Sequence, residues 1–201
     1  MKTDEYISLK SRTKGLYRDR GSKFIAIASP AGSADEAIHI IEEIRKEYRD
    51  ARHHCYAYKI GTGEDNWRVN DDGEPSGSAG NPILGQIRSF ELTNVVIVVV
   101  RYFGGTLLGV GGLINAYRSA AKEALSNGQI VKKTIKVNYQ VKFPYSAMND
   151  IMKLIKDEKL MQDNQKFELE CSLNISFRKN IEDKVLRALV SINGVEYTSL
   201  D

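Results

Sequence analysis

The run Val-Val-Ile-Val-Val-Val at residues 95–100 places the strongest constraint on the fold of this 201-residue chain. Six consecutive β-branched residues favour an extended strand, and because no polar residue alternates with them, both faces of that strand should be covered. The sequence therefore predicts a central strand of a layered α/β domain, continuing to Phe103. A glycine-rich loop over residues 104–112 and a helix over residues 113–125 are predicted to follow it.

The segments before this strand predict the rest of the same domain. Strands near residues 24–28 and 53–60 flank an amphipathic helix over about residues 34–50. Asn81 and Pro82 are residue types found at a helix cap and at the first helical position, so they predict a second, short helix. Helices and strands thus mix in one domain that extends to about residue 130.

From residue 131 onward, apolar and polar residues alternate strictly, which is typical of strands with one buried face. Two such strands, two amphipathic helices and two shorter strands give the order βαββαβ, a ferredoxin-like arrangement. Ser146 and Asn180 are predicted to cap its helices. The fold class is therefore α+β, with domains at residues 1–130 and 131–201.

RNA-recognition modules share the βαββαβ order, but they stack bases on exposed aromatic residues. The polar face of the strands in this second domain contains no aromatic residue. A structural or docking role is therefore the favoured interpretation of this domain. The residues of that face are Thr134, Lys136, Asn138, Gln140, Lys142, Glu168, Glu170, Ser172, Asn174 and Ser176.

Composition excludes several classes of protein. The net charge of +3 is only mildly basic, so it does not establish nucleic-acid binding. Residues 10–23 carry six basic side chains and one acid, Asp19, which predicts either an anionic partner or a solvated segment. No apolar run reaches membrane-spanning length and no signal peptide is visible, so a cytoplasmic protein without a membrane partner is expected. Cys55 and Cys171 form no paired motif.

The glycine-rich loop is the segment best suited to hold a ligand. A strand that leads through glycines into a helix directs backbone N–H groups and a helix dipole at one point, as in sites for phosphates. The loop does not fit the phosphate-binding loop of nucleotide hydrolases, because Gly109 is not followed by Lys-Ser/Thr. It does not fit the Gly-x-Gly-x-x-Gly motif of dinucleotide-binding proteins either, because Ile114 stands where the third glycine is required. Close packing of helix on sheet is the alternative reason for the glycines. The predicted anion- or nucleic-acid-binding residues are Arg101, Tyr102, Gly104, Gly105, Gly109, Gly111, Gly112, Tyr117 and Lys23.

An acidic loop over residues 70–80 is predicted to fold against the glycine-rich loop. Its carboxylates have three alternative uses, which are turn formation, a salt bridge to Arg101, and coordination of a cation such as Mg²⁺. The sequence contains no nucleophile elbow and no His-Glu-x-x-His motif, so no catalytic residue, resident metal or cofactor is predicted. The residues assigned to loop bracing or cation binding are Asp71, Asp72, Glu74 and His53.

Three motifs, in order along the chain, carry a family resemblance. They are Ala-x-His-x-Cys-Tyr-Ala at residues 51–57, Asp-Asp-Gly-Glu-Pro-Ser-Gly-Ser-Ala-Gly-x-Pro-Ile-Leu at residues 71–84, and Val-x-Arg-Tyr-Phe-Gly-Gly-x-x-Leu-Gly-x-Gly-Gly-Leu-x-x-Ala-Tyr at residues 99–117. Together they resemble the YigZ/IMPACT family. The C-terminal half is similar to the extra domain of its bacterial members.

This resemblance carries implications for both domains. It implies that the N-terminal domain has the fold of the second domain of a small-subunit ribosomal protein. It also implies that the C-terminal domain is similar to a terminal domain of elongation factor G. Eukaryotic relatives act in translational control through a protein partner that governs an initiation-factor kinase. A shared fold is an analogy and does not by itself assign a function.

The sequence leads to one main hypothesis and two alternatives. The main hypothesis is a non-catalytic cytoplasmic protein, linked to translation or its regulation, that binds RNA or the ribosome. The glycine-rich loop, Arg101 and the basic N-terminal segment are expected to contact the phosphates. The first alternative is a regulatory module that binds a protein partner. The second is an enzyme that holds a phosphate ligand with Mg²⁺.

Overall fold

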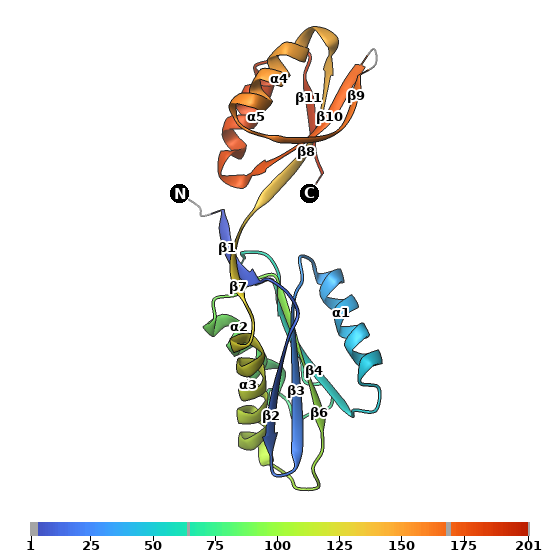
Figure 1. Cartoon of the computed structure of the whole chain (residues 1–201), viewed down its shortest axis with the longest axis vertical. Helices are drawn as coiled ribbons and strands as arrows, with labels where there is room; N and C mark the ends of the chain where they lie inside the picture. The colour runs from blue at the N-terminus through green and yellow to red at the C-terminus, as the bar shows by residue number, and fades with distance from the viewer. Residues whose placement is uncertain (1–3, 64, 168–169, 201) are drawn as a thin grey trace. The chain divides into compact units, whose positions relative to one another are not determined.

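The computed structural model describes residues 4–63, 65–167 and 170–200, and the chain divides into two compact units (Figure 1). Residues 6–133 form the N-terminal unit. The C-terminal unit consists of the residues from 134 onward together with Asp4 and Glu5. The boundary expected after residue 130 falls inside strand β7 (Ile130–Thr134), which pairs with β1 (Glu5–Leu9).

The N-terminal unit is built on a five-stranded antiparallel sheet with the strand order β2-β3-β6-β4-β5. The central strand is β6, which pairs with β3 and β4, and residues 95–100 are all buried. The predicted central strand is therefore confirmed. The strands of this sheet are β2 (Thr13–Asp19), β3 (Ser22–Pro30), β4 (His53–Lys59), β5 (Trp67–Asn70) and β6 (Val95–Tyr102).

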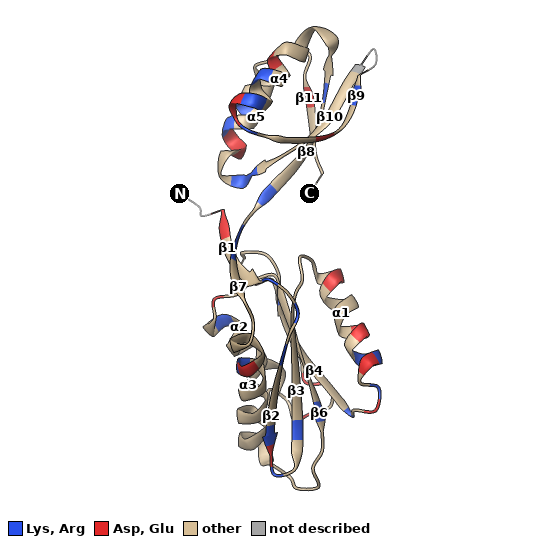
Figure 2. Ribbon diagram, in the orientation of Figure 1, with Lys and Arg blue, Asp and Glu red and all other residues tan. Residues whose placement is uncertain are grey.

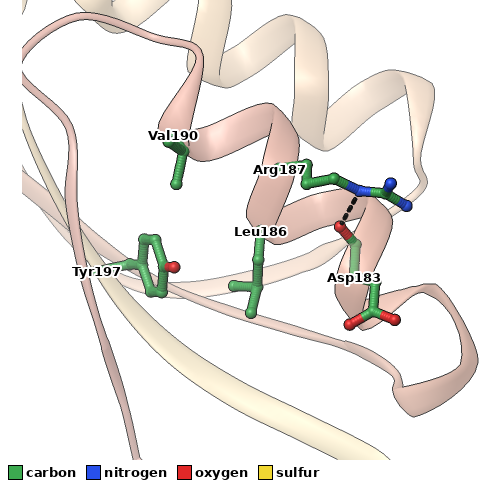
Figure 3. Close-up of a pocket in the computed structure, with 5 residues that line it drawn as sticks. All are labelled: Asp183, Leu186, Arg187, Val190 and Tyr197. Carbon is green, nitrogen blue, oxygen red and sulfur yellow. Dashed lines mark hydrogen bonds between the residues drawn. The ribbon is translucent and has the colours of Figure 1, made fainter.

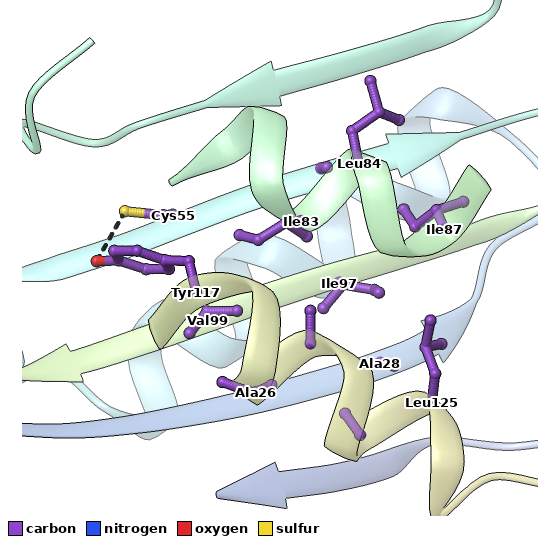
Figure 4. Close-up of a cluster of buried hydrophobic side chains, with 14 of the residues drawn as sticks. Ala26, Ala28, Cys55, Ile83, Leu84, Ile87, Ile97, Val99, Tyr117 and Leu125 are labelled. Atoms are coloured by element: carbon purple, nitrogen blue, oxygen red, sulfur yellow. Dashed lines mark hydrogen bonds between the residues drawn. The ribbon is translucent and has the colours of Figure 1, made fainter. Parts of the chain in front are cut away.

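Helices cover both faces of this sheet, as the unbroken apolar run at residues 95–100 of β6 requires. Val96, Val98 and Val100 pack against α1 (Ala34–Glu47). The alternate residues, among them Ile97 and Val99, face α2 (Gly80–Ser89) and α3 (Gly109–Ser126) in a second core (Figure 4). Gly15 of β2 permits the close approach of α3, since a Cβ atom there would lie 2.3 Å from the backbone nitrogen of Ala124.

Helix α3 begins earlier than the sequence predicted. Its first residue is Gly109 rather than Leu113, so Gly109, Gly111 and Gly112 form the first turn of the helix. Residues 103–108 are the connecting loop. The prediction of a longer loop was wrong because glycine is a poor helix former by intrinsic propensity, and packing of the following residues on the sheet overrides that propensity.

Helix α2 also differs in how it begins. It starts at Gly80, so Pro82 lies within its first turn and Asn81 does not cap it. The cap residue is Ala79, whose side chain makes no capping hydrogen bond. Instead, the carboxylate of Asp71 accepts hydrogen bonds from the backbone N–H groups of Ala79 and Gly80 at 3.0 and 2.8 Å. A carboxylate distant in the sequence thus replaces the local cap that was predicted.

The C-terminal unit has the predicted βαββαβ order, with a four-stranded sheet in the order β11-β8-β10-β9. Its two helices pack on one face of that sheet around a core of apolar residues. Its elements are β8 (Lys136–Pro144), α4 (Met148–Asp157), β9 (Met161–Phe167), β10 (Glu170–Arg178), α5 (Glu182–Val190) and β11 (Glu196–Ser199).

The predicted caps of these two helices were wrong. Ser146 and Asn180 lie inside short 3₁₀ turns that precede α4 and α5, and neither helix has a side-chain cap. Of the residues assigned to the polar face, Glu168 and the side chain of Glu170 lie outside the described part of the structure. Across the described residues, no helix combines the length and the apolar character that a bilayer crossing requires.

Candidate functional site

The two loops singled out by the sequence meet at one end of the N-terminal sheet. The strand register places His53 of β4 beside Arg101 of β6, and Lys23 of β3 beside Tyr102. The turn between β2 and β3, the acidic loop and the loop over residues 103–108 therefore gather where β6 ends. They form a buried polar cluster and an exposed surface above it.

The buried polar cluster consists of Arg101, Glu74, Tyr117 and Cys55. Nη1 of Arg101 donates to both carboxylate oxygens of Glu74 at 2.6 and 2.9 Å. The hydroxyl of Tyr117 donates to Glu74 at 2.7 Å, and the Cys55 thiol lies 3.3 Å from that hydroxyl (Figure 4). The side chains of Arg101 and Glu74 are only 7% and 4% exposed. This is the salt bridge from the acidic loop to Arg101 that the sequence offered as one alternative.

Aromatic rings enclose the guanidinium of Arg101. Its central carbon lies 5.5 Å from the ring centre of Phe24 and 5.6 Å from that of Phe103, which are distances for cation–π contact. Its Nε atom is buried without a hydrogen-bond partner among the described residues. The charge of Arg101 is thus balanced by Glu74 inside the unit, and little of it is available to an external anion.

The thiol of Cys55 and the hydroxyl of Tyr117 stay protonated, and therefore uncharged, at neutral pH. Burial raises the pKa of the Cys55 thiol, and the carboxylate of Glu74 adds to the effect. Burial likewise raises the pKa of the Tyr117 hydroxyl. Since the thiolate is the nucleophilic form of cysteine, Cys55 has no nucleophile to offer at neutral pH. The chemistry of the cluster is that of structural support.

Asp71 shapes the acidic loop by accepting three backbone hydrogen bonds. Its carboxylate binds the N–H groups of Gly77, Ala79 and Gly80 at 2.8, 3.0 and 2.8 Å. The negative charge therefore lies at the beginning of α2, where the helix dipole favours it. Asp71 has the role of a turn-forming carboxylate.

Asp72 connects the acidic loop to α1 and β4. Its carboxylate accepts hydrogen bonds from the backbone N–H of His54 at 2.7 Å and from Nη2 of Arg45 at 3.0 Å. Nδ1 of His53 lies 2.8 Å from the backbone oxygen of Asp72. Each predicted cation ligand thus has protein partners. Among the residues that the structure describes, no group of three or more His, Cys, Asp or Glu side chains is placed to hold a metal ion.

The exposed surface above this cluster begins with the loop over residues 103–108. Phe103, Leu107 and Val110 are 54%, 80% and 53% exposed, although all three are apolar. Gly104 packs on the β2–β3 turn so closely that a Cβ atom would lie 1.9 Å from the carbonyl carbon of Gly21. Helix α3 then begins without a side-chain cap, so the N–H groups of its first turn have no partner within the helix, and residues 109–111 are exposed.

Basic residues flank this loop on the β2–β3 turn. Arg20 and Gly21 have φ values of 44° and 80°, which fit a two-residue hairpin turn. Arg18 and Arg20 are exposed there, and Nζ of Lys23 lies 6.0 Å above the ring of Tyr102. Figure 2 shows basic segments, coloured blue, at this end of β2 and β3. We call residues 18–23, the loop over residues 103–108 and the first turn of α3 the loop-end surface.

The structure separates the predicted binding residues into two groups. Arg101 and Tyr117 lie inside the unit, with Glu74. The others, except Tyr102, belong to the loop-end surface. The sequence assigned Arg18 and Arg20 to the basic segment at residues 10–23 that was expected to face phosphates, but it did not place them individually beside the glycine-rich loop. The Arg-Gly pair between two strands is a hairpin signal that could have done so. The predicted residues at the surface are Lys23, Gly104, Gly105, Gly109, Gly111 and Gly112, whereas Tyr102 is half-buried against the core that α1 covers and its hydroxyl donates to Asp50 at 2.8 Å.

A separate depression of about 450 Å³ lies between α5 and β11 in the C-terminal unit (Figure 3). Nε of Arg187 donates to the backbone carbonyl of Asp183 at 3.0 Å. The remaining lining is mainly apolar, and sequence reasoning assigned no site to it. The lining residues are Asp183, Leu186, Arg187, Val190 and Tyr197.

An α/β unit with this buried cluster, followed by a ferredoxin-like unit, defines a two-domain class of α+β protein. The family model for the Impact N-terminal domain matches residues 20–125. The chain is 34% identical to the IMPACT family member YvyE of Bacillus subtilis over 83% of its length and 75% of that protein. It is 31% identical to an IMPACT family member of Haemophilus influenzae, covering 93% of this chain and 90% of that one.

The chain therefore belongs to the IMPACT family. A solved structure, described as that of a hypothetical protein, matches 99% of this chain and 98% of its own length with a TM-score of 0.75 and 27% identity. The match extends over both units. The family assignment made from the three motifs is confirmed.

Proposed function

We propose that this chain is a non-catalytic cytoplasmic protein that binds RNA, free or in the ribosome, and that this binding links it to translation or its regulation. The loop-end surface makes the contact. The observation that carries the proposal is the position of Arg18, Arg20 and Lys23 on and beside the β2–β3 turn, against which Gly104 of the glycine-rich loop packs. Basic side chains and outward N–H groups are the usual partners of phosphate oxygens.

In this proposal Arg101 is a supporting residue. Its guanidinium is hydrogen-bonded to Glu74 and lies between two aromatic rings, one of which belongs to Phe103 at the base of the loop. Arg101 thus holds the loop that contacts the RNA. Lys23 and the backbone of Gly105 and Gly109 are the predicted residues that reach the phosphates.

Salt dependence of binding to a single-stranded RNA tests the proposal. Replacement of Arg18, Arg20 and Lys23 by alanine should weaken binding and lower the slope of log K against log salt by about 2, since each phosphate contact on a single strand contributes roughly 0.7. Binding at low salt that is unchanged in this triple variant would overturn the proposal, as would an absence of binding at low salt.

A second triple variant is the matched control. Arg68, Arg88 and Lys122 are exposed residues of the same unit, outside the basic segment at residues 10–23. Arg68 lies on β5, where the register aligns it with Tyr58 and so places it away from the end of β6. Replacing these three by alanine removes the same charge and should leave the slope within experimental error of the unmodified protein.

Binding of a protein partner is the second function that an observation favours. Phe103, Leu107 and Val110 expose apolar surface on one loop and the turn after it, and exposed apolar patches often mark protein interfaces. Co-purification that survives nuclease treatment and is lost in Leu107→Ser would support this alternative. The magnesium-dependent enzyme has no comparable support, because the carboxylates of the acidic loop contact protein groups.

A further inference from the structure

A cleft of about 300 Å³ lies between α2 and α3 in the N-terminal unit, outside the loop-end surface. Ile114 and Arg118 line it from α3, one turn apart. Four residues line it from α2, namely Asn81, Pro82, Gly85 and Gln86. The cleft is open at Gly85, because a Cβ atom built there would meet no atom within 4 Å.

The polar groups of this cleft are available to a ligand. Within the described residues, the side chains of Arg118, Asn81 and Gln86 make no hydrogen bond and no ion pair. None of the lining residues is acidic, so Arg118 gives the cleft a net positive charge. The two amides can each donate and accept, which suits them to the edge of a planar polar group.

These features together restrict the class of ligand. An inorganic anion would use Arg118 but would leave both amides and the apolar wall of Pro82 and Ile114 without a role. A purely apolar ligand would cover three polar side chains without satisfying them, which is unfavourable. A ligand with a phosphate, a planar base carrying donors and acceptors, and apolar faces uses every group in the cleft, and amide side chains commonly hydrogen-bond the edges of bases.

We propose that this cleft binds a single nucleotide, either free or as one unit of an RNA chain. Arg118 holds the phosphate, and Asn81 and Gln86 hydrogen-bond the edge of the base, which lies against Pro82 and Ile114. Binding of a nucleotide that is part of an RNA chain rests on the proposed function. Helix α3 connects the two, because it lines the cleft and its first turn belongs to the loop-end surface.

Titration of the full chain with nucleoside monophosphates, followed by amide resonances, tests this assignment. Nucleotides should shift the signals of Gly85 and of the side-chain amides of Asn81 and Gln86. Ribose 5-phosphate and inorganic phosphate should bind at least tenfold more weakly. Equal affinity for inorganic phosphate would overturn the proposal, because it would show a simple anion site. Signals that stay unshifted at about 10 mM nucleotide, which is tenfold above a millimolar Kd, would also overturn it.

Variants separate binding from folding. Gly85→Leu places a side chain in the cleft from an exposed helical position where a Cβ atom meets no atom within 4 Å, so the protein should keep or raise its unfolding temperature and lose at least tenfold in nucleotide affinity. Arg118→Gln should lower the affinity at least fivefold. Lys122→Gln, one helical turn further along α3, is the matched control and should change nothing. Unchanged nucleotide affinity in Gly85→Leu and Arg118→Gln would overturn the assignment.

The same proteins distinguish this inference from the function on which it partly rests. If nucleotides bind but single-stranded RNA does not, the nucleotide site in the cleft is supported and the proposed RNA-binding function is refuted. If RNA binding depends on the charges of residues 18–23 but mononucleotides do not shift the amide resonance of Gly85, the RNA-binding function is supported and the nucleotide site in the cleft is refuted.

Discussion

The buried pair of Glu74 and Arg101 leads to a quantitative prediction. Glu74→Gln keeps the size of the side chain and an acceptor for the Tyr117 hydroxyl, but removes the charge opposite Arg101. Because both side chains are more than nine-tenths buried, the guanidinium would remain as a charge without its partner. Breaking a buried ion pair in this way costs about 3–5 kcal/mol. The free energy of unfolding of the N-terminal unit should fall by that amount.

Tryptophan fluorescence during urea unfolding measures this change. Trp67 is the single tryptophan of the chain and lies on β5, so its emission follows the N-terminal unit. With a urea dependence of about 2 kcal/mol per molar, a loss of about 4 kcal/mol moves the unfolding midpoint down by roughly 2 M. Glu123→Gln, an exposed position on α3, is the control and should stay within about 0.5 kcal/mol of the unmodified protein.

A double variant tests the reason for the loss. Replacing Glu74 and Arg101 together by methionine removes the unpaired charge, so this protein should be more stable than Glu74→Gln, as found when buried ion pairs are exchanged for apolar residues. A Glu74→Gln protein within 1 kcal/mol of the unmodified one would refute the reasoning. A double variant less stable than the single one would refute the assignment of the cost to the unpaired charge.

Three further predictions follow from contacts elsewhere. Gly104→Ala should destabilise the N-terminal unit by about 1–3 kcal/mol in urea unfolding, because its Cβ would overlap the β2–β3 turn, whereas Gly111→Ala, with open space around it, should not. Cys55 is buried, and burial raises the pKa of its thiol, so a thiol reagent at pH 8 should modify it only after unfolding, as mass spectrometry would show. The guanidinium of Arg178, hydrogen-bonded to Asp4 at 2.8 and 2.9 Å, holds the pKa of that carboxyl below its usual 3.8. The resulting stabilisation is complete above about pH 4 and is lost as the pH falls through the lowered pKa, so thermal unfolding of Arg178→Met should depend less on pH in that range.

The position of Arg101 changes how the family motifs are understood. The motif around residues 99–117 and the acidic loop meet through Arg101, Glu74 and Tyr117 inside the unit. These residues therefore fix the shape of the loop end, and the residues that face solvent lie beside them. In the proposed function, Arg101 supports the loop from inside the unit, and Arg18, Arg20 and Lys23 make the contact with RNA.

The sequence by itself determined the elements that follow from a local pattern. Six β-branched residues in a row required a strand covered on both faces, and strict alternation after residue 131 required strands with one buried face. Period and residue type are local properties, so β6 and the order of the C-terminal unit were predictable. The three motifs were sufficient to identify the family.

Only the tertiary structure decided which charged groups meet. Asp71 accepts a hydrogen bond from the backbone of Ala79, eight residues further along the chain, just before α2. Glu74 and Arg101 form an ion pair although 27 residues separate them, and Gly104 packs on the turn that carries Arg20. The physical reason is that strand register and loop packing set these distances, and neither leaves a periodic signal in the sequence. The same reason explains why Arg101, the most prominent cation of the motif, is buried and balanced.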